Sequence, residues 1–290
     1  MTDRATAVRV PAAGAGTGLS TVAQLQRTGR TALALLRRDY AQRRVIRFAV
    51  LLDLCFGMVN LLVFYFISRL LHHPTAQLGG AQNYFGYIAV GLAVTLAVQS
   101  AVTEAATQMR EERITGTLAQ LVSQPVNSAG LALGLVAYPI VFALARSVLY
   151  VLVAALGLGL AVGHAAWFGV IVIALLGCAA VVAVGIVLLA ITLAIPRSDP
   201  VVPLAALALT FLSGAYFPVS VLPGYLQAIS DPLPTRLVLE GLRSALFSGG
   251  GWEQPAGWLL LTVAVLLPIA VVLFGWATSI AIRLGRLTGV

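Results

Sequence analysis

The sequence predicts an all-α membrane protein with six transmembrane helices. Of its 290 residues, 60% are hydrophobic and only 10% are charged, whereas soluble domains carry about 25% charged residues. The apolar residues gather in six runs, most of them near the ~20 residues that a helix needs to cross ~30 Å of hydrocarbon. These runs are too long, and too rich in Leu, Ala and Gly, for the alternating strands of a membrane β-barrel.

Short polar or proline-containing segments separate the first five predicted spans, and a long stretch from Pro218 to Pro255 precedes the sixth. We treat residues 48–290 as one transmembrane domain. The spans cover about residues 48–71, 84–106, 128–161, 166–195, 200–217 and 256–282. Residues 1–19, rich in Ala, Gly and Thr, are predicted to form a disordered tail. No apolar segment follows their basic residues, so we expect no signal peptide.

Residues 20–47 predict an amphipathic helix on the membrane surface. Its apolar face buries in the acyl boundary while its Arg residues stay near anionic headgroups. An ordinary basic flank that orients the first span is the alternative. The apolar residues that recur at helical spacing are Val22, Leu25, Leu33, Leu36 and Tyr40.

The Arg residues predict that both termini lie in the cytoplasm, because cytoplasmic loops are enriched in Lys and Arg. With the N terminus inside, fourteen Arg residues fall on the cytoplasmic side and only Arg69, Arg236 and Arg243 on the outer side. The net charge of +8 thus comes mainly from Arg residues near the spans, and they do not interleave with exposed aromatic residues as in nucleic-acid-binding proteins. Membrane lipid is an expected partner, and nucleic acid is not.

The cytoplasmic stretch "MREERITGTLAQLVSQP", residues 109–125, joins the second span to the third. Its charges continue the second helix into water, and Gly116 is expected to break it. Thr117 and Gln120 fit a capping box, and Pro125 disfavours helical geometry in the residue before it. The sequence therefore predicts a short, independently capped helix at about residues 117–124.

Such a helix suits insertion into a groove on a partner protein. Its apolar residues Leu118, Leu121 and Val122 would supply the contact, beside the charged residues Glu111, Glu112 and Arg113. The alternative is a solvated elbow that packs on its own bundle.

Residues 218–247 predict a re-entrant helical hairpin on the outer side. Two short apolar helices, "PGYLQAIS" and "TRLVLEGLRSALF", flank a turn at 231–234. Arg236, Glu240 and Arg243 share one helical face, on which Glu240 can pair with either Arg. Irregular backbone in the outer leaflet must be shielded by protein. We expect this hairpin to gate a pathway or to plug the bundle by packing.

Two charged residues lie well inside predicted spans, more than one helical turn from either end. Arg146 is near the middle of the third span, where an Arg must face protein or a wet cavity. It either lines a translocation path and meets an anionic group, or holds the bundle together. Asp53, about two turns into the first span, is expected to be structural more than a proton relay.

Aromatic residues are the other candidates for a path or gate, although packing alone also explains them. They favour a hydrophobic or amphipathic compound over a long sugar polymer. The aromatic candidates for the translocation path or gate are Phe56, Phe211, Tyr216 and Phe217.

No metal site is expected. His72, His73 and His164 lack ligand spacing, and Cys55 and Cys178 are expected to be buried free thiols in separate spans.

Two stretches resemble signatures of ATP-binding-cassette (ABC) type-2 exporter permeases. Residues 111–126, "EERITGTLAQLVSQPV", resemble the family's cytoplasmic loop, with an acidic residue followed by Gly-Thr-Leu, Leu and Pro. Residues 211–243, "FLSGAYFPVSVLPGYLQAISDPLPTRLVLEGLR", look like its signature before the last span. The turn "DPLPTR" departs from the family's usual Asn-Pro-Leu/Met-Thr-Tyr.

The resemblance implies one permease subunit of an exporter in the cytoplasmic membrane of a bacterium, paired with a second permease, identical or not. Two separate ATPase subunits would bind ATP and Mg²⁺, and the helix at 117–124 would be the coupling helix docked in one of them. The chain lacks Lys and therefore any P-loop, so we expect no cofactor and no ATPase activity in it.

The proposed cargo is a drug, antibiotic or lipid, with a polysaccharide or glycolipid as the alternative. A membrane-embedded lipid-modifying enzyme would need convergent acids, His or metal ligands, and an ion channel would need a polar pore repeat. The ionisable residues of this sequence are scattered instead.

Overall fold

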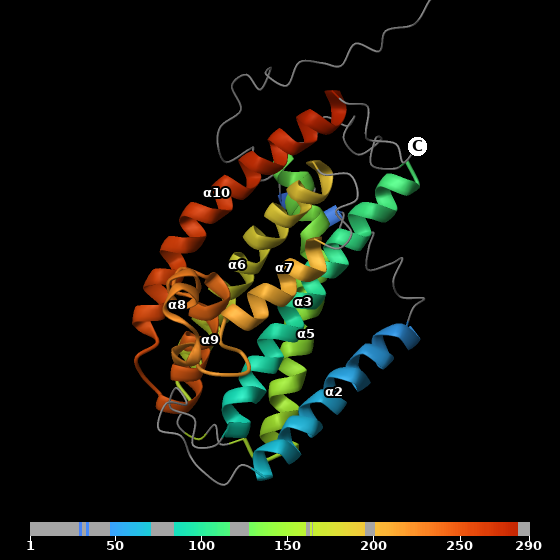
Figure 1. The fold of residues 1–290 in the computed structure, drawn as a ribbon. Helices are drawn as coiled ribbons and strands as arrows, with labels where there is room; N and C mark the ends of the chain where they lie inside the picture. Colours follow the sequence, from blue (N-terminus) through green and yellow to red (C-terminus); the bar gives the residue numbers. More distant parts are fainter. Residues whose placement is uncertain are drawn as a thin grey trace, which may run out of the picture.

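A computed structural model of the chain describes residues 29–30, 33–34, 47–70, 84–116, 128–160, 163, 165–194 and 201–283. Every regular element in these ranges is a helix, and the long ones form one bundle (Figure 1). The five long helices are α2 (Arg47–Leu70), α3 (Tyr84–Ile114), α5 (Ser128–Gly157), α6 (Trp167–Ala194) and α10 (Glu253–Arg283). The short elements are α7 (Val201–Leu212), η1 (Val219–Val221), α8 (Gly224–Ser230), α9 (Pro234–Arg243) and η2 (Ser244–Ser248).

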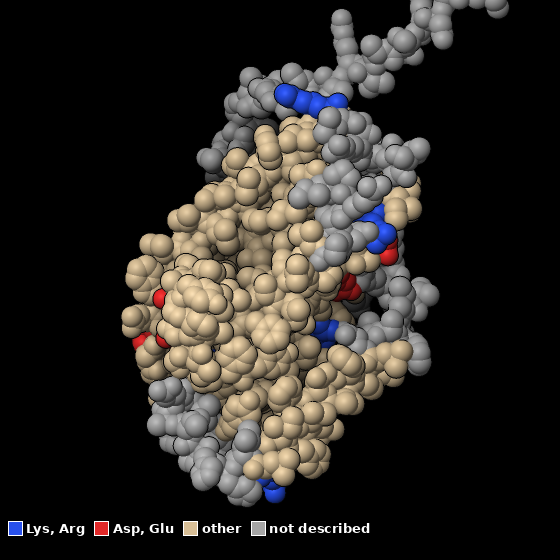
Figure 2. Space-filling model, in the orientation of Figure 1, with Lys and Arg blue, Asp and Glu red and all other residues tan. Residues whose placement is uncertain are grey.

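A helix lies at each of the six predicted spans. Four of them are long and apolar enough to cross a membrane by themselves within the described ranges, namely Tyr84–Glu112, Ala129–Gly157, Trp167–Ala194 and Glu253–Arg283. Helix α2 contributes the shorter apolar stretch Leu54–Leu70. On the face shown in Figure 2, the charged residues among those described occupy only a few small spots.

The predicted fifth span, 200–217, was too long. Helix α7 has 12 residues and ends at Leu212, so it rises only about 18 Å of the ~30 Å hydrocarbon layer. The chain breaks at Gly214, whose φ of 75° is left-handed and favours glycine. Apolar composition continues through this break, so composition alone could not reveal it.

The helices pack through small residues. Helix α6 packs against both α10 and α9, which also contact each other, and α3 packs along α5. Gly177 of α6 faces Val238 of α9, and Gly185 of α6 faces Val136 of α5. Small residues allow close helix approach, which drives association where the hydrophobic effect does not. The largest cluster of buried residues, from α3, α5, α6 and α10, includes eight alanines: Ala101, Ala105, Ala132, Ala143, Ala190, Ala270, Ala277 and Ala281.

The two short helices predicted around the turn at 231–234 are present as α8 and α9. Helix α9 runs antiparallel to α6, because Val238 lies at Gly177 and Gly241 lies at Ile173. Gly177 is about 15 Å along α6 from its start at Trp167, which is half the thickness of a hydrocarbon core. The hairpin thus reaches the middle of the bundle and fills the space that the short α7 leaves.

Two predicted helices fall largely outside the described residues. Of the amphipathic helix at 20–47, only Gly29, Arg30, Leu33 and Ala34 are described before α2, and they are helical and exposed. The coupling helix at 117–124 lies outside the described residues. Helix α3, however, ends at Ile114, and Gly116 takes a φ of 73°, which confirms the predicted break.

The broken region rests on a glycine of α3. A Cβ on Gly91 would overlap the carbonyl oxygen of Ala215, which is backbone and cannot rotate away. We expect Gly91→Ala to destabilise the protein by about 1–3 kcal/mol, seen as a lower thermal unfolding midpoint of the purified chain. The matched control is Gly257→Ala in α10, where a Cβ meets nothing within 4 Å. An equal loss of stability in Gly91→Ala and Gly257→Ala would contradict the role of Gly91 in this close contact.

Candidate functional site

A cavity of about 480 Å³ lies between α2, α3, α5 and α7. It is the candidate functional site because it brings Arg146 and uncharged polar residues together inside the predicted spans. Two of the sequence-predicted path residues, Phe56 and Arg146, line it. The residues around it are Phe56, Gly57, Leu96, Gln99, Ser100, Thr103, Arg146, Tyr150, Pro203, Ala206 and Leu207.

Arg146 both lines this cavity and joins α5 to α3. The residue is 4% exposed, and its Nη2 donates to the carbonyl oxygen of Leu96 at 3.0 Å. Its guanidinium lies 5.8 Å from the centre of the Phe142 ring, within reach of a cation–π attraction. The next residue, Ser147, donates its hydroxyl to the carbonyl oxygen of Ala93 at 2.9 Å. The two bonds fix the cavity's cation against α3.

The polar wall of the cavity comes from α3. The side-chain amide of Gln99 donates to the Thr210 hydroxyl at 2.8 Å and so ties α3 to α7. Ser100 and Thr103 lie beside it and bond to carbonyls of their own helix. Sequence reasoning missed these residues, although the spacing of Gln99 and Thr103 within an apolar run, four residues apart, places both on one helix face.

The other walls are made by α2, α5 and α7. Gly57 of α2 lies against Tyr150 of α5, and a Cβ on Gly57 would overlap the tyrosine hydroxyl. Phe56 is 65% exposed, so it borders both the cavity and the outside of the bundle. Asp53 precedes Gly57 by one helical turn on α2, and its side chain is outside the described atoms.

The remaining aromatic candidates meet at the end of α7. The Phe211 ring centre lies 6.1 Å from that of Tyr216 and 6.3 Å from that of Phe217, and Phe64 of α2 stacks on Tyr216 at 5.8 Å. Edge and offset contacts at these distances are favourable. The cluster lies beyond the cavity along α7, because Ala206 and Leu207 line the cavity and Phe211 follows them by one turn.

Arg243 binds the backbone that the α7 break exposes. It is 6% exposed, and its guanidinium donates to the carbonyl oxygens of Gly214, Ala215 and Tyr87 at 3.1–3.2 Å. The same group lies 3.5 Å from the centre of the Tyr87 ring, and the Tyr87 hydroxyl donates to Gly214 at 2.7 Å. Carbonyls without a helical partner are costly in a membrane, so this arginine stabilises the break.

The predicted pairing of Glu240 was wrong. Arg236 forms its ion pair with Asp231, and Arg243 turns to backbone carbonyls, while Glu240 is exposed. Arg243 lies on the side of α9 that packs into the bundle. Its carbonyl partners come from α3 and the loop after α7, which a spacing rule within one helix cannot include.

The comparisons with known proteins identify the family. Residues 30–247 match the family model described as ABC-2 type transporter, which is 218 of the 290 residues. The chain belongs to the ABC-2 transporter family. As a member of this family, it is the multi-pass membrane permease of an ABC-2 type transporter, has no ATPase activity of its own, and requires ATPase partner subunits. No curated protein matches it.

The end of α3 that leads to the permease's cytoplasmic-loop motif is partly described. Glu111 is exposed and Glu112 is 9% exposed, and the Thr115 hydroxyl donates to the carbonyl of Glu111 at 2.8 Å, which closes the last turn. The side chain of Arg113 lies outside the described atoms. The same holds for the predicted contact residues Thr117, Leu118, Gln120, Leu121 and Val122.

Permeases of this family typically carry no cofactor. Among the described residues, His, Cys, Asp and Glu form no group of three that could hold a metal ion. Cys55 is exposed and Cys178 half-buried, and both are free thiols, so the expected burial of Cys55 was wrong. The three histidines were predicted outside the spans, and His72, His73 and His164 lie outside the described residues.

The two arginines of α9 give a matched test. Arg243→Met removes the donors from three buried carbonyls, and we expect the permease to lose at least about 3 kcal/mol of stability, because each bond to a charged donor contributes about 1.5–3 kcal/mol. Arg236→Met removes only a partly exposed ion pair with Asp231 and should cost at most about 1 kcal/mol. Thermal unfolding of both purified variants measures the difference, and similar midpoints would refute the role of Arg243.

Proposed function

We propose that this permease is half of an ATP-driven exporter that moves a hydrophobic or amphipathic compound, such as a drug, antibiotic or lipid, out across the cytoplasmic membrane. The observation that carries the proposal is the cavity between α2, α3, α5 and α7, which combines a polar wall with an apolar one. Its volume, about 480 Å³, lies in the range of small-molecule sites.

The lining suits an amphipathic molecule, with one polar and one apolar end. Gln99, Ser100 and Thr103 offer hydrogen-bonding groups from α3, and Arg146 adds a fixed cation. The opposite side presents Phe56 and Leu207, against which a ring or alkyl part can pack. A long sugar polymer would need polar groups along its whole route, so a polysaccharide or glycolipid stays the second candidate.

A second permease copy, identical or paralogous, would complete this site. The cavity borders two helix faces that carry large exposed apolar side chains, one on α2 and one on α7. Such faces must meet either lipid or another apolar protein surface. A partner on this side would turn two half-cavities into one enclosed path. The exposed residues are Leu52, Phe56, Val59, Val63 and Phe66 on α2, and Leu204, Leu207 and Phe211 on α7.

Helix α3 links the energy source to the cavity. It has 31 residues and is about 46 Å long. One end leads to the predicted coupling helix at 117–124, the middle forms the polar wall, and Tyr84 and Tyr87 bind the loop after α7. If the Ile114 end is cytoplasmic, as the Arg distribution predicts, a tilt imposed by the ATPase subunits reaches the cavity and the loop in one rigid element.

The outer exit would pass the aromatic cluster Phe211, Tyr216 and Phe217, with the α8–α9 hairpin beside it. Arg236 and Asp231 hold the hairpin's turn, and Arg243 holds its inner face to the loop. Glu240, exposed on the same helix, is available to a second copy or to water. We propose that cargo leaves when this loop and the cluster move apart.

The first test is substrate-stimulated ATP hydrolysis by the permease reconstituted with its ATPase subunits. Arg146→Gln keeps a donor for the Leu96 carbonyl but removes the charge. For an anionic amphipathic compound that stimulates the wild type, we expect the half-maximal concentration to rise about tenfold, the equivalent of 1.4 kcal/mol. Thr262→Val, on α10 and outside the cavity lining, is the control. Unchanged stimulation by every active compound would remove Arg146 from the path.

The second test concerns the coupling helix. Leu121→Asp places a charge on its predicted apolar face, and we expect the ATPase subunit to be lost when the permease is purified by a tag. Ser248→Asp, in an exposed position at the opposite end of the bundle, should retain it. Full retention with Leu121→Asp would mean that the loop contacts only its own bundle.

A further inference from the structure

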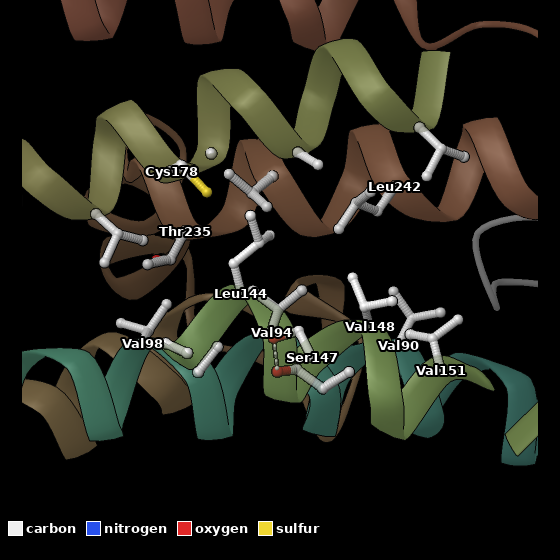
Figure 3. A pocket seen from close by; sticks show the side chains of 18 of the residues that line it. Val90, Val94, Val98, Leu144, Ser147, Val148, Val151, Cys178, Thr235 and Leu242 are labelled. Carbon is white, nitrogen blue, oxygen red and sulfur yellow. Dashed lines mark hydrogen bonds between the residues drawn. The ribbon is translucent and has the colours of Figure 1, made fainter. Parts of the chain in front are cut away.

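A second cavity, of about 510 Å³, lies between α3, α5, α6 and α9 (Figure 3). Its lining has no charged residue. The few polar side chains are Ser147, Cys178 and Thr235, and the Ser147 hydroxyl already donates to the carbonyl of Ala93. A site so poor in hydrogen-bond partners does not hold ordered water.

The α3–α5 pair separates this cavity from the candidate translocation site. Arg146 faces the first cavity and its neighbour Ser147 faces the second. On α3, Gln99 lines the first and Val98 lines the second. Since both arginine and serine are bonded to α3, the wall is closed by hydrogen bonds at its centre. The second cavity therefore needs its own occupant.

The cavity is long and runs along the helices. On α6 its lining extends from Trp167 to Val184, about 26 Å at the rise of an α-helix. Figure 3 shows the same direction, with Val98 and Thr235 near one end and Val90, Val151 and Leu242 near the other. A leaflet is about 15 Å deep, so the cavity follows the membrane normal for more than one leaflet. Tryptophan at the mouth is typical of the headgroup level.

One side of the cavity is open toward the surface of the bundle. Leu144, Val148, Leu152 and Leu156 of α5 line the cavity and are also exposed, so its interior continues into the lipid-contacting surface of a membrane-spanning helix. The deep side is closed by buried residues such as Val98 and Ala180.

From this shape, lining and opening we infer that the cavity binds one acyl chain of an outer-leaflet phospholipid. The chain enters beside Trp167 and lies between α5 and α6 against α9. A flexible hydrocarbon chain fills an apolar space that water leaves empty. In the bilayer the gain in free energy comes from packing, as between membrane helices.

The bound chain supports the hairpin. Helix α9 contributes Thr235, Val238 and Leu242 to the cavity, and the same helix carries Arg243, which holds the loop after α7. An acyl chain behind α9 keeps this helix against α3 and α6. The lipid thereby acts on the exit region from the side opposite the translocation cavity, whichever compound is exported.

The experiment uses the full-length permease in nanodiscs of phosphatidylglycerol that carries a diazirine on one acyl chain. After illumination, mass spectrometry maps the labelled peptides. We expect concentrated labelling of α5 and α6 residues that line the cavity. Ala174→Phe, which fills it, should reduce this labelling at least fivefold, while Leu175→Phe, exposed on the same helix and outside the lining, should not.

A second pair guards against misfolding of Ala174→Phe. Val148→Trp blocks the mouth on α5, and Val141→Trp, exposed on the same helix and outside the lining, is its control. Added phospholipid should raise the unfolding midpoint of delipidated wild type and of both controls, but not of Ala174→Phe or Val148→Trp.

Equal labelling of the wild type and of these two variants would overturn the inference. A disulfide between two copies of Val148→Cys would overturn it by showing that a second copy covers the mouth. Displacement of the label by a compound that stimulates ATP hydrolysis would overturn it by showing that the cavity binds cargo.

Discussion

The fold depends on how it satisfies a backbone broken inside the membrane. Helix α7 stops at Leu212, and the carbonyls of the following loop have no helical partner. Arg243 donates to two of them and to Tyr87, while the Ser230 hydroxyl bonds to the carbonyl of Leu212. Since unsatisfied carbonyls cost several kcal/mol each in hydrocarbon, this arginine permits a half-length helix, and with it the space that the α8–α9 hairpin occupies.

The need to satisfy polar groups in hydrocarbon also explains how the hydroxyl groups of the bundle are bonded. Most hydroxyls in the described helices bond to a carbonyl three or four residues back in their own helix, as Thr95 and Thr107 do. Three other side chains join different helices: Arg146 and Ser147 bond to α3, and Gln99 bonds to α7. These bonds sit at or beside the candidate cavity, so the polar groups that hold the helices together also give the cavity its polar wall.

Helix α3 is the element that relates the parts. Its Ile114 end leads to the cytoplasmic-loop motif, its middle separates a polar cavity from an apolar one, and its tyrosines bind the loop after α7. Gly91 of α3 lets the loop after α7 approach its backbone closely, because a Cβ there would overlap the carbonyl oxygen of Ala215.

The sequence by itself determined the class of protein, the positions of the helices, the break at Gly116 and the two short helices around residues 231–234, because hydrophobic run length and Gly or Pro positions are local signals. It also determined the family, through two motifs. Only the tertiary structure decided that α7 ends early, that Arg243 binds carbonyls instead of Glu240, that Gln99 and Arg146 share a cavity, and that a second cavity lies behind them. Each of these depends on contacts between segments far apart in the chain, and a buried arginine takes whichever acceptors the neighbouring helices bring to it.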